Sequence, residues 1–199
     1  MKKLRVMLLF GGRSAEHDVS RVTAVAVAKA LDPARYEIVP VGITTDGQWQ
    51  LANDAQRMLE GARDALPAAF AVDGEPVTDL VPSPGGDALG ADVVFPLLHG
   101  PYGEDGTVQG LLELAGLPYV GAGVLGSAVG MDKIMMKSAF AAAGIPSARF
   151  LALRDGHDAA SFCDDVASTF GFPCFVKPSN MGSSVGVSKA HDRAELARA

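Results

Sequence analysis

Two glycine-rich loops in the first half of the chain hold the residues best suited to chemistry. Residues 99–106 (HGPYGEDG) combine three glycines with one histidine and two carboxylates, and residues 11–20 (GGRSAEHDVS) form a similar set. Each loop comes directly after an apolar run. Because glycine loses chain entropy on folding, such loops are costly unless a ligand approaches their backbone. Both loops are therefore candidate sites, with Glu16 and His99 as candidate functional side chains.

These residues also have an ordinary structural interpretation. Acidic residues favour the first turn of a helix, so Glu16 and His17 could simply open one. A single histidine such as His99 is more often a structural residue with satisfied hydrogen bonds than a catalytic one. Taken one at a time, the two loops leave both interpretations open.

A third segment, residues 175–189 (FVKPSNMGSSVGVSK), suits the binding of phosphate groups. Lys177 lies at the end of an apolar strand and is kept extended by Pro178. The loop beyond it offers glycines and hydroxyls, namely Gly182, Ser183, Ser184 and Gly186. Backbone N–H groups and hydroxyls in such a loop can surround phosphate oxygens, while the lysine supplies compensating charge. A flexible hairpin with a solvated lysine is the alternative interpretation.

A second lysine stands near the start of another helix. Asp132 can cap a helix that runs to Ala143, and Gly144 and Pro146 stop it. Lys133 then lies in the first turn, where the helix dipole favours anions. Considered alone, Lys133 could also be a solvated surface residue.

The elements around the first two loops alternate between strands and helices. Strands are predicted at 4–10, 36–44, 93–98 and 119–120, and helices at 19–31 and 107–115. A hairpin turn at 45–47 leads into 48–51, a short helix containing Met58 and Leu59 follows, and 73–91 is predicted to be loop-like. This order predicts an α/β fold with a parallel sheet covered by helices. Open sheets of this kind bind ligands at the carboxyl ends of their strands, where both loops begin.

The character of the sequence changes near residue 123, and we place a domain boundary between 121 and 131. The following elements, 148–153, a helix at 158–170 and strands at 174–177 and 185–189, predict a second α/β unit. Residues 192–199 begin a helix and contain no stop signal. We therefore expect the second unit to be truncated.

One motif in the boundary region has an alternative meaning. Residues 121–126 (GAGVLG) fit G-x-G-x-x-G after a short strand, which is typical of dinucleotide binding. However, that strand is the last of its domain, and the acidic residue expected about 20 positions later is absent. A structural turn between domains is the favoured interpretation. No G-x-x-x-x-G-K-[ST] sequence is present, so a P-loop is not supported.

Composition excludes several classes of function. The 199 residues have a formal net charge of −6, which argues against nucleic acid as a partner. No apolar run approaches the roughly 18 residues that a membrane helix needs, so no membrane partner and a cytoplasmic location are expected. Cys163 and Cys174 are too few for a disulfide framework, which favours a reducing compartment.

Taken together and in order, four segments resemble the D-alanine–D-alanine ligase family of ATP-grasp enzymes. They are Gly11-Gly12-x-Ser14-x-Glu16, His99-Gly100-x-x-Gly103-Glu104-Asp105-Gly106, Met131-Asp132-Lys133, and Lys177-Pro178 leading to Gly182-Ser183-Ser184-Val185-Gly186. The resemblance covers essentially the whole chain. It implies a Rossmann-like, pre-ATP-grasp parallel-sheet domain at 1–122, followed by an incomplete ATP-grasp domain at 123–199.

The resemblance also implies the reaction, in which ATP is used to join two D-alanines for peptidoglycan synthesis and cell wall biogenesis. ATP phosphorylates the carboxylate of the first D-alanine. The amine of the second then attacks the acylphosphate and releases phosphate through a tetrahedral intermediate. Phosphoryl transfer of this kind needs positioning and charge neutralisation more than covalent chemistry from the protein.

The same resemblance assigns roles by motif position. Glu16 would hold the ammonium of the first D-alanine, His99 would lie near its carboxylate, and Ser183 would link to Glu16. The ATP phosphates would be bound by Lys133, Lys177, Gly182, Ser183 and Ser184. The family's Mg²⁺ ligands are expected beyond residue 199, so no metal ligand is assigned in this chain. We accordingly expect the 199-residue chain alone to lack ligase activity, which ADP release with D-alanine would test.

Other functions share part of this evidence. D-alanine–D-lactate ligation uses every motif quoted above. A dinucleotide-dependent oxidoreductase would use residues 121–126, and cofactor titration would reveal it. A catalytically silent nucleotide-binding module is favoured only if the natural protein ends at Ala199. The family commonly forms homodimers, which the sequence neither supports nor excludes.

Overall fold

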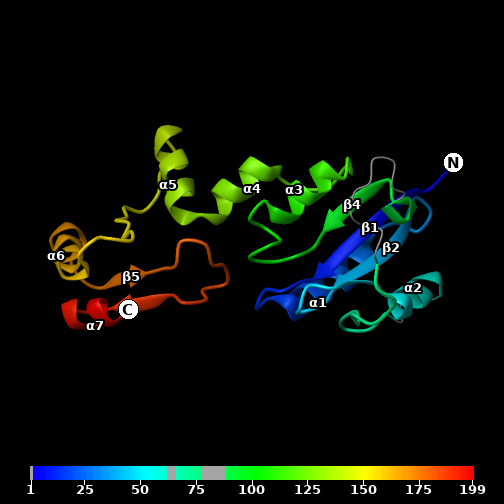
Figure 1. Cartoon of the computed structure of the whole chain (residues 1–199), viewed down its shortest axis with the longest axis horizontal. Coiled ribbons are helices and arrows are strands. Elements are labelled where there is room, and N and C mark those ends of the chain that lie inside the picture. Colours follow the sequence, from blue (N-terminus) through cyan, green and yellow to red (C-terminus); the bar gives the residue numbers. More distant parts are fainter. Residues whose placement is uncertain (1, 62–65, 78–87) are drawn as a thin grey trace. The chain divides into compact units, whose positions relative to one another are not determined.

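The computed structural model describes residues 2–61, 66–77 and 88–199 (Figure 1). The chain divides into two compact units, Met1–Ala128 and Val129–Ala199. Each unit is described by itself below. The domain boundary at 122/123 stays a prediction, although the division into units falls six residues later along the same stretch of chain.

The first unit is built on a four-stranded sheet with the order β3-β2-β1-β4. Its parallel strands are β1 (Leu4–Gly11), β2 (Tyr36–Ile43) and β4 (Val93–Pro96), and β3 (Trp49–Leu51) pairs antiparallel with β2. The expected strand at 119–120 is reduced to an isolated parallel bridge between Tyr119 and Val94. The predicted parallel sheet and hairpin are therefore confirmed.

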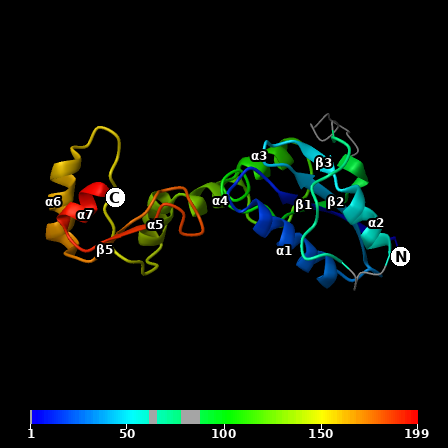
Figure 2. The same cartoon turned by 90° about the horizontal axis from the view of Figure 1, so that it is seen from below.

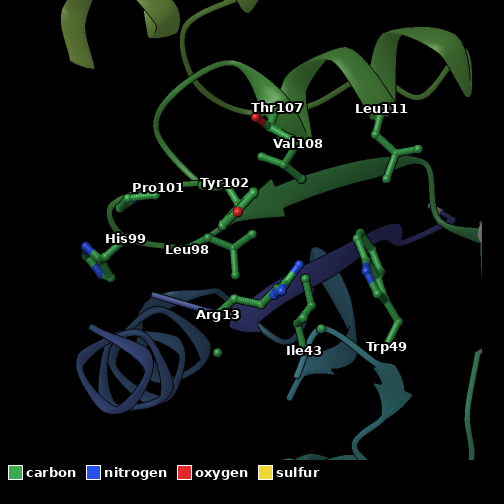
Figure 3. A pocket seen from close by; sticks show the side chains of 14 residues that line it. Arg13, Ile43, Trp49, Leu98, His99, Pro101, Tyr102, Thr107, Val108 and Leu111 are labelled. Carbon is green, nitrogen blue, oxygen red and sulfur yellow. The ribbon is translucent and has the colours of Figure 1, made fainter. Parts of the chain in front are cut away.

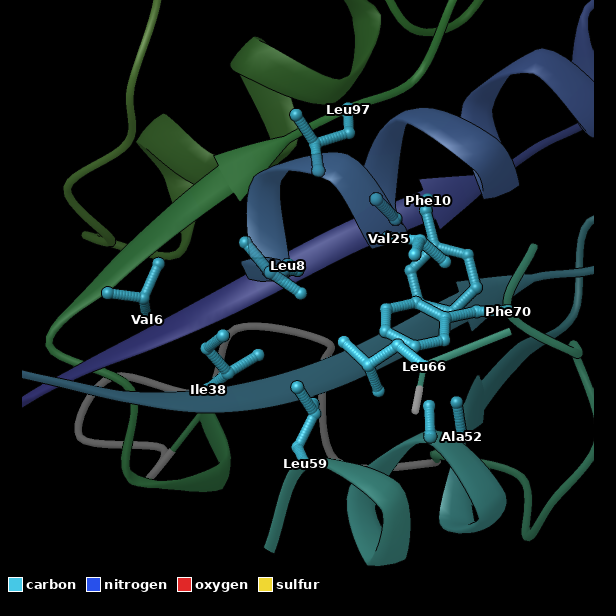
Figure 4. Close-up of a cluster of buried hydrophobic side chains, with 13 residues drawn as sticks. Val6, Leu8, Phe10, Val25, Ile38, Ala52, Leu59, Leu66, Phe70 and Leu97 are labelled. Atoms are coloured by element: carbon cyan, nitrogen blue, oxygen red, sulfur yellow. The ribbon is translucent and has the colours of Figure 1, made fainter. Parts of the chain in front are cut away.

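Helices cover both faces of this sheet, since α3 lies across it from α1 (Figure 2). They are α1 (His17–Ala30), α2 (Asn53–Glu60) and α3 (Thr107–Leu114). Alternate side chains of β1 point to opposite faces. Leu8 and Phe10 join the cluster beneath α1 and α2 (Figure 4), whereas Met7 and Leu9 join the cluster beneath α3. The central strand is thus buried on both sides, as its continuous apolar sequence predicts.

The loop-like segment predicted at 73–91 is described only in part. Pro76 forms an isolated bridge with Gln50, and Ala88–Gly90 makes a single 3₁₀ turn. Residues 78–87 lie outside the described residues.

In the second unit, helices α5 (Lys133–Ala142) and α6 (Ala159–Phe170) match the predicted helices. A further helix, α4 (Val124–Met131), crosses the division between the units, and α7 (Arg193–Arg198) ends the described chain. Strands β5 (Cys174–Val176) and β6 (Ser188–Ala190) form an antiparallel pair.

Two expectations for the second unit are wrong in detail. Residues 148–153, predicted as an element, take no regular structure and pair with neither β5 nor β6. The strand expected from Val185 begins only at Ser188, because residues 182–187 form turns instead. In these turns Val185 donates its backbone N–H to Gly182, and Val187 donates to Ser184.

Candidate functional site

The two glycine-rich loops meet at the carboxyl ends of β1 and β4, as predicted. These strands are parallel neighbours, with Leu9 opposite Pro96. Ser20, fully buried in α1, joins their ends, because its Oγ accepts from the Gly11 N–H at 2.8 Å and donates to the Leu97 carbonyl at 2.6 Å. The register of the sheet and one buried hydroxyl therefore hold the two loops together.

Ser14 connects the backbone of Glu16 to that of His99. Its Oγ donates to the His99 carbonyl at 2.6 Å and accepts from the Glu16 N–H at 3.2 Å. Gly100 makes the close approach feasible, since it has φ +69° and a Cβ there would lie 3.1 Å from Glu16 Oε2. The structure thus brings Glu16 and His99 together, while their chemical roles stay predictions.

Glu16 and His17 lie where the first loop enters α1. His17 is the first residue of α1, and its Nδ1 lies 2.8 Å from the Gly12 carbonyl, so it shapes the loop. Glu16 occupies the N-cap position, but its side chain makes no capping hydrogen bond. The role of the Glu16 carboxylate therefore stays a prediction.

The carboxylates of the second loop maintain the shape of that loop. Glu104 accepts from the Gly100 N–H at 2.7 Å, and Asp105 accepts from the N–H groups of Tyr102 and Thr107 at 2.9 and 3.0 Å. Partial burial acts to raise the pKa of Asp105, but these backbone hydrogen bonds outweigh it and hold that pKa below its ordinary value. Glu104 therefore anchors the backbone next to His99, and Asp105 anchors the later part of the loop.

A pocket of about 330 Å³ opens beside the loops, between the strand ends and α3 (Figure 3). His99 lines it, and Glu16 does not. Sequence analysis missed Trp49 of β3 and Arg13 as lining residues. The Arg13 guanidinium carbon lies 5.3 Å from the ring centre of Tyr102, so a cation packs on an aromatic face at this wall. No motif in the sequence associates Trp49 with the two loops. Trp49 reaches the pocket because β3 folds back antiparallel to β2.

Lys133 and the 177–186 loop lie together within the second unit. The Lys133 backbone N–H donates to the Ser179 carbonyl at 2.9 Å, and its Nζ donates to the Met181 carbonyl at 2.5 Å. Asp132 caps α5 as predicted, accepting from Ile134 and Met135 at 2.8 and 3.0 Å. Hydrogen bonds from the backbone, that of Met135 foremost, lower the pKa of the Asp132 carboxyl.

The loop itself has an unusual backbone. Ser183, Ser184 and Gly186 have φ of +46°, +60° and +70°, in the left-handed region that most side chains avoid. A Cβ on Gly186 would lie 2.8 Å from Cγ of Pro178, so glycine is needed there. Successive residues in such conformations can form an anion-binding concavity. Lys177 follows β5 directly and is exposed.

The predicted site residues fall into two groups. Glu16 and His99 belong to the first unit, and the second unit contains Lys133, Lys177, Gly182, Ser183 and Ser184. The expectation that both groups share one cleft stays a prediction. Among the described residues, no three His, Cys, Asp or Glu side chains are grouped to hold a metal ion. None of the described helices has the length and apolar character of a membrane span.

Comparison with known proteins gives a consistent result. Residues 5–122 match the family model described as D-ala D-ala ligase N-terminus, and residues 139–199 match D-ala D-ala ligase C-terminus. The chain is 48% identical to a D-alanine–D-alanine ligase of Mycobacterium sp. (strain JLS), over 98% of this chain and 56% of the relative. It is 46% identical to that of Bacillus cytotoxicus, over 100% of this chain and 57% of the relative.

Solved structures agree with the sequence comparison. The D-alanine–D-alanine ligase from Coxiella burnetii superposes with a TM-score of 0.83 at 35% identity, over 98% of this chain and 59% of that one. The VanG D-Ala:D-Ser ligase from Enterococcus faecalis gives 0.74 at 28% identity, over 98% of this chain and 57% of that one. The chain thus spans 56 to 59% of the length of these four proteins.

Proposed function

Because the chain belongs to the D-alanine–D-alanine ligase family, we propose that it provides the first D-alanine subsite and part of the ATP site of such an enzyme. The reaction is the ATP-dependent joining of two D-alanines through an acylphosphate, for peptidoglycan synthesis. The observation that supports it best is the link from Glu16 through Ser14 to His99, because it holds the backbones of these two residues together at the strand ends.

In the first subsite, the Glu16 carboxylate pairs with the ammonium of D-alanine. A charge-assisted hydrogen bond of this kind selects an amino acid over a neutral acid. His99 lies on the adjoining loop, beside the first D-alanine. Gly100 allows Glu16 Oε2 to approach the second loop, since it has no Cβ.

In the ATP site, Lys133 and Lys177 neutralise phosphate charge, and the 182–186 loop surrounds phosphate oxygens with N–H groups and hydroxyls. Lys133 has a second task, because its bond to the Met181 carbonyl holds the loop against α5. Charge neutralisation and alignment are the main contributions that a protein makes to phosphoryl transfer. The acylphosphate then loses phosphate when the amine of the second D-alanine attacks.

The family resemblance also implies Mg²⁺, which oxygen ligands of carboxylates would hold. The described residues provide no such group, so no step of this proposal is assigned to the metal. Location in the cytoplasm, where ATP is supplied, and assembly as a homodimer are further parts of the proposal. The comparisons do not favour a dinucleotide-dependent oxidoreductase, and residues 124–126 of its motif lie inside α4.

The test is a chimera in which these 199 residues replace the matching region of the Mycobacterium ligase. We expect it to release ADP in a D-alanine-dependent reaction that forms D-alanyl-D-alanine. ATP hydrolysis without dipeptide would contradict the proposal. ADP release by the 199-residue chain on its own is measured in parallel.

Within the chimera, Glu16→Gln removes the charge that faces the ammonium while keeping the side-chain shape. We expect KM for the first D-alanine to rise about tenfold or more, as loss of a charge-assisted hydrogen bond costs roughly 1.5 to 3 kcal/mol. Asp18→Asn is the matched control, because Asp18 lies two residues away and its side chain is 84% exposed in an ion pair with Arg21. Equal effects of the two changes would contradict the role of Glu16.

A further inference from the structure

The imidazole of His99 has a partner on α1 that the family motifs do not include. Nε2 of His99 lies 3.3 Å from the hydroxyl oxygen of Thr23. The same hydroxyl donates to the Val19 carbonyl, one helical turn earlier, at 2.9 Å. The contact is partly buried.

A count of hydrogens decides the direction of the bond to His99. A threonine hydroxyl has one hydrogen to donate and two lone pairs to accept. The Val19 carbonyl can only accept, and it is the closer partner, so it takes that hydrogen. Toward His99 the hydroxyl oxygen is therefore an acceptor, and Nε2 must carry a hydrogen.

We propose that Thr23 is a positioning residue that fixes His99 in the Nε2–H tautomer and leaves Nδ1 as the ring nitrogen available to a ligand. Among the described residues, no hydrogen bond joins Nδ1 of His99 to the protein. A neutral imidazole with a hydrogen on Nε2 has its acceptor lone pair on Nδ1, so Nδ1 can accept a hydrogen bond from the ammonium of D-alanine and cannot bond its carboxylate. The hydroxyl of Thr23 thereby determines which ring atom performs the chemistry of this histidine.

The rest of His99 is held independently of Thr23. Ser14 Oγ binds the His99 carbonyl, and the following N–H, that of Gly100, donates to Glu104. Because the backbone is anchored on both sides, loss of the Thr23 hydroxyl should free the ring and leave the loop in place. This separation allows the proposal to be tested without dismantling the site.

The test is a two-bond ¹H–¹⁵N NMR spectrum of the ¹⁵N-histidine-labelled 199-residue chain, in which the two tautomers give different nitrogen shifts. His99 is assigned among the four histidines by the change His99→Gln. We expect the wild-type ring to show the Nε2–H pattern. A wild-type ring with the hydrogen on Nδ1, or an even mixture, would overturn the proposal whatever the variants do.

Two variants at position 23 separate the hydroxyl from the shape of the side chain. Thr23→Val keeps the branched shape and removes the hydroxyl, so His99 should shift toward a mixture of tautomers. Thr23→Ser keeps the hydroxyl and should retain the wild-type pattern. Ser138→Ala is the matched control, because Ser138 makes the same one-turn bond, to Ile134, at 2.8 Å in α5. An unchanged His99 pattern in Thr23→Val would overturn the proposal.

The consequence for substrate rests on the proposed function and is measured in the chimera. Loss of one neutral hydrogen bond costs about 1 kcal/mol, so Thr23→Val should raise KM for the first D-alanine about fivefold, and Thr23→Ser should restore it. If the NMR pattern changes as expected while KM stays constant, the assignment of His99 to the substrate site is wrong and the tautomer assignment holds. The two failures are therefore distinguishable.

Discussion

Glycine at position 100 controls how closely the two loops of the first unit approach. Its φ of +69° costs a residue with a Cβ roughly 1 to 2 kcal/mol. Gly100→Ala would in addition place a methyl group 3.1 Å from Glu16 Oε2. We expect this variant to lose stability by about 1 to 2 kcal/mol and to weaken D-alanine binding in the chimera more than tenfold.

Gly116→Ala separates the backbone strain from the contact with Glu16. Gly116 has a similar φ of +66°, and a Cβ there would meet nothing within 4 Å. The Gly116→Ala variant should therefore lower the free energy of unfolding, measured by urea denaturation, by a similar amount. It should leave KM for D-alanine unchanged. If both variants affect KM equally, the close approach of Gly100 to Glu16 has no role in binding.

At the scale of single residues, the sequence identifies the two loops of the candidate site but only some of the residues that shape it. Glu16 and His99 stand out because glycines and charged groups cluster around them. Ser20 and Thr23 do not stand out, because each sits in an ordinary helical pattern and its importance depends on a bond to residues 76 or 77 positions away. A hydrogen bond across a sheet end leaves no local signal in the chain.

At the scale of elements, caps and loop contacts determine where α5 presents Lys133. The Asp132 carboxylate accepts from two N–H groups of the first turn, which lowers its pKa below the unfolded value of about 3.9. A group with a lowered folded pKa contributes stability that is present above the unfolded pKa and is lost as pH falls through the folded pKa.

Asp132→Asn removes this charge and keeps an acceptor oxygen. We expect the free energy of unfolding to fall by about 0.3 to 1 kcal/mol at neutral pH, the usual size of a charge effect at a helix N-terminus. The difference from wild type should shrink as pH falls from the unfolded pKa of about 3.9 through the lower folded pKa, since the wild-type carboxyl then becomes neutral as well. Asp155→Asn, in the turn before α6, provides the control. A difference that is constant from pH 7 to pH 3 would contradict a carboxylate cap.

The contact between α5 and the 177–186 loop yields a prediction about ATP. Lys133→Met removes both the charge and the bond to the Met181 carbonyl while keeping a long side chain. Loss of a charged hydrogen bond should weaken ATP binding by the chimera roughly tenfold or more in titration calorimetry. Lys137→Met is the control one turn later, where Nζ bonds the Ala148 carbonyl instead. Equal weakening by both variants would contradict a specific role for Lys133.

The predicted elements match the structure where the local sequence pattern is enough to determine the element. They differ where the element depends on a neighbouring strand. The buried run of β1 and the capped helix α5 are visible in the chain, because apolar continuity and an Asp-led first turn are local features. Residues 148–153, predicted as a further element of the second unit, take no regular structure and join neither strand of the β5–β6 pair. Edges and partners are properties of the assembled sheet.

At the scale of the whole molecule, burial is unevenly divided between the two units. Both clusters of buried hydrophobic residues consist of side chains from Met1–Ala128. In Val129–Ala199, which the structure describes completely, the buried hydrophobic residues are Cys163, Val166 and Ala190. Phe175 of β5 is 61% exposed. Since burial of apolar surface is the main favourable term in folding, the second unit should be the less stable one.

Hydrogen exchange followed by mass spectrometry measures this difference in the intact 199-residue chain. Local stability spans a range up to the global value, and strands in a buried core lie at its upper end. We expect peptides covering β1 and β2 to exchange at least about a hundredfold more slowly than those covering β5 and β6, a gap of roughly 3 kcal/mol. Addition of ATP should narrow the gap, because a ligand that binds the folded form stabilises it. Uniform protection along the chain, or slower exchange in β5 than in β1, would contradict the assignment of folding stability to the two clusters of the first unit.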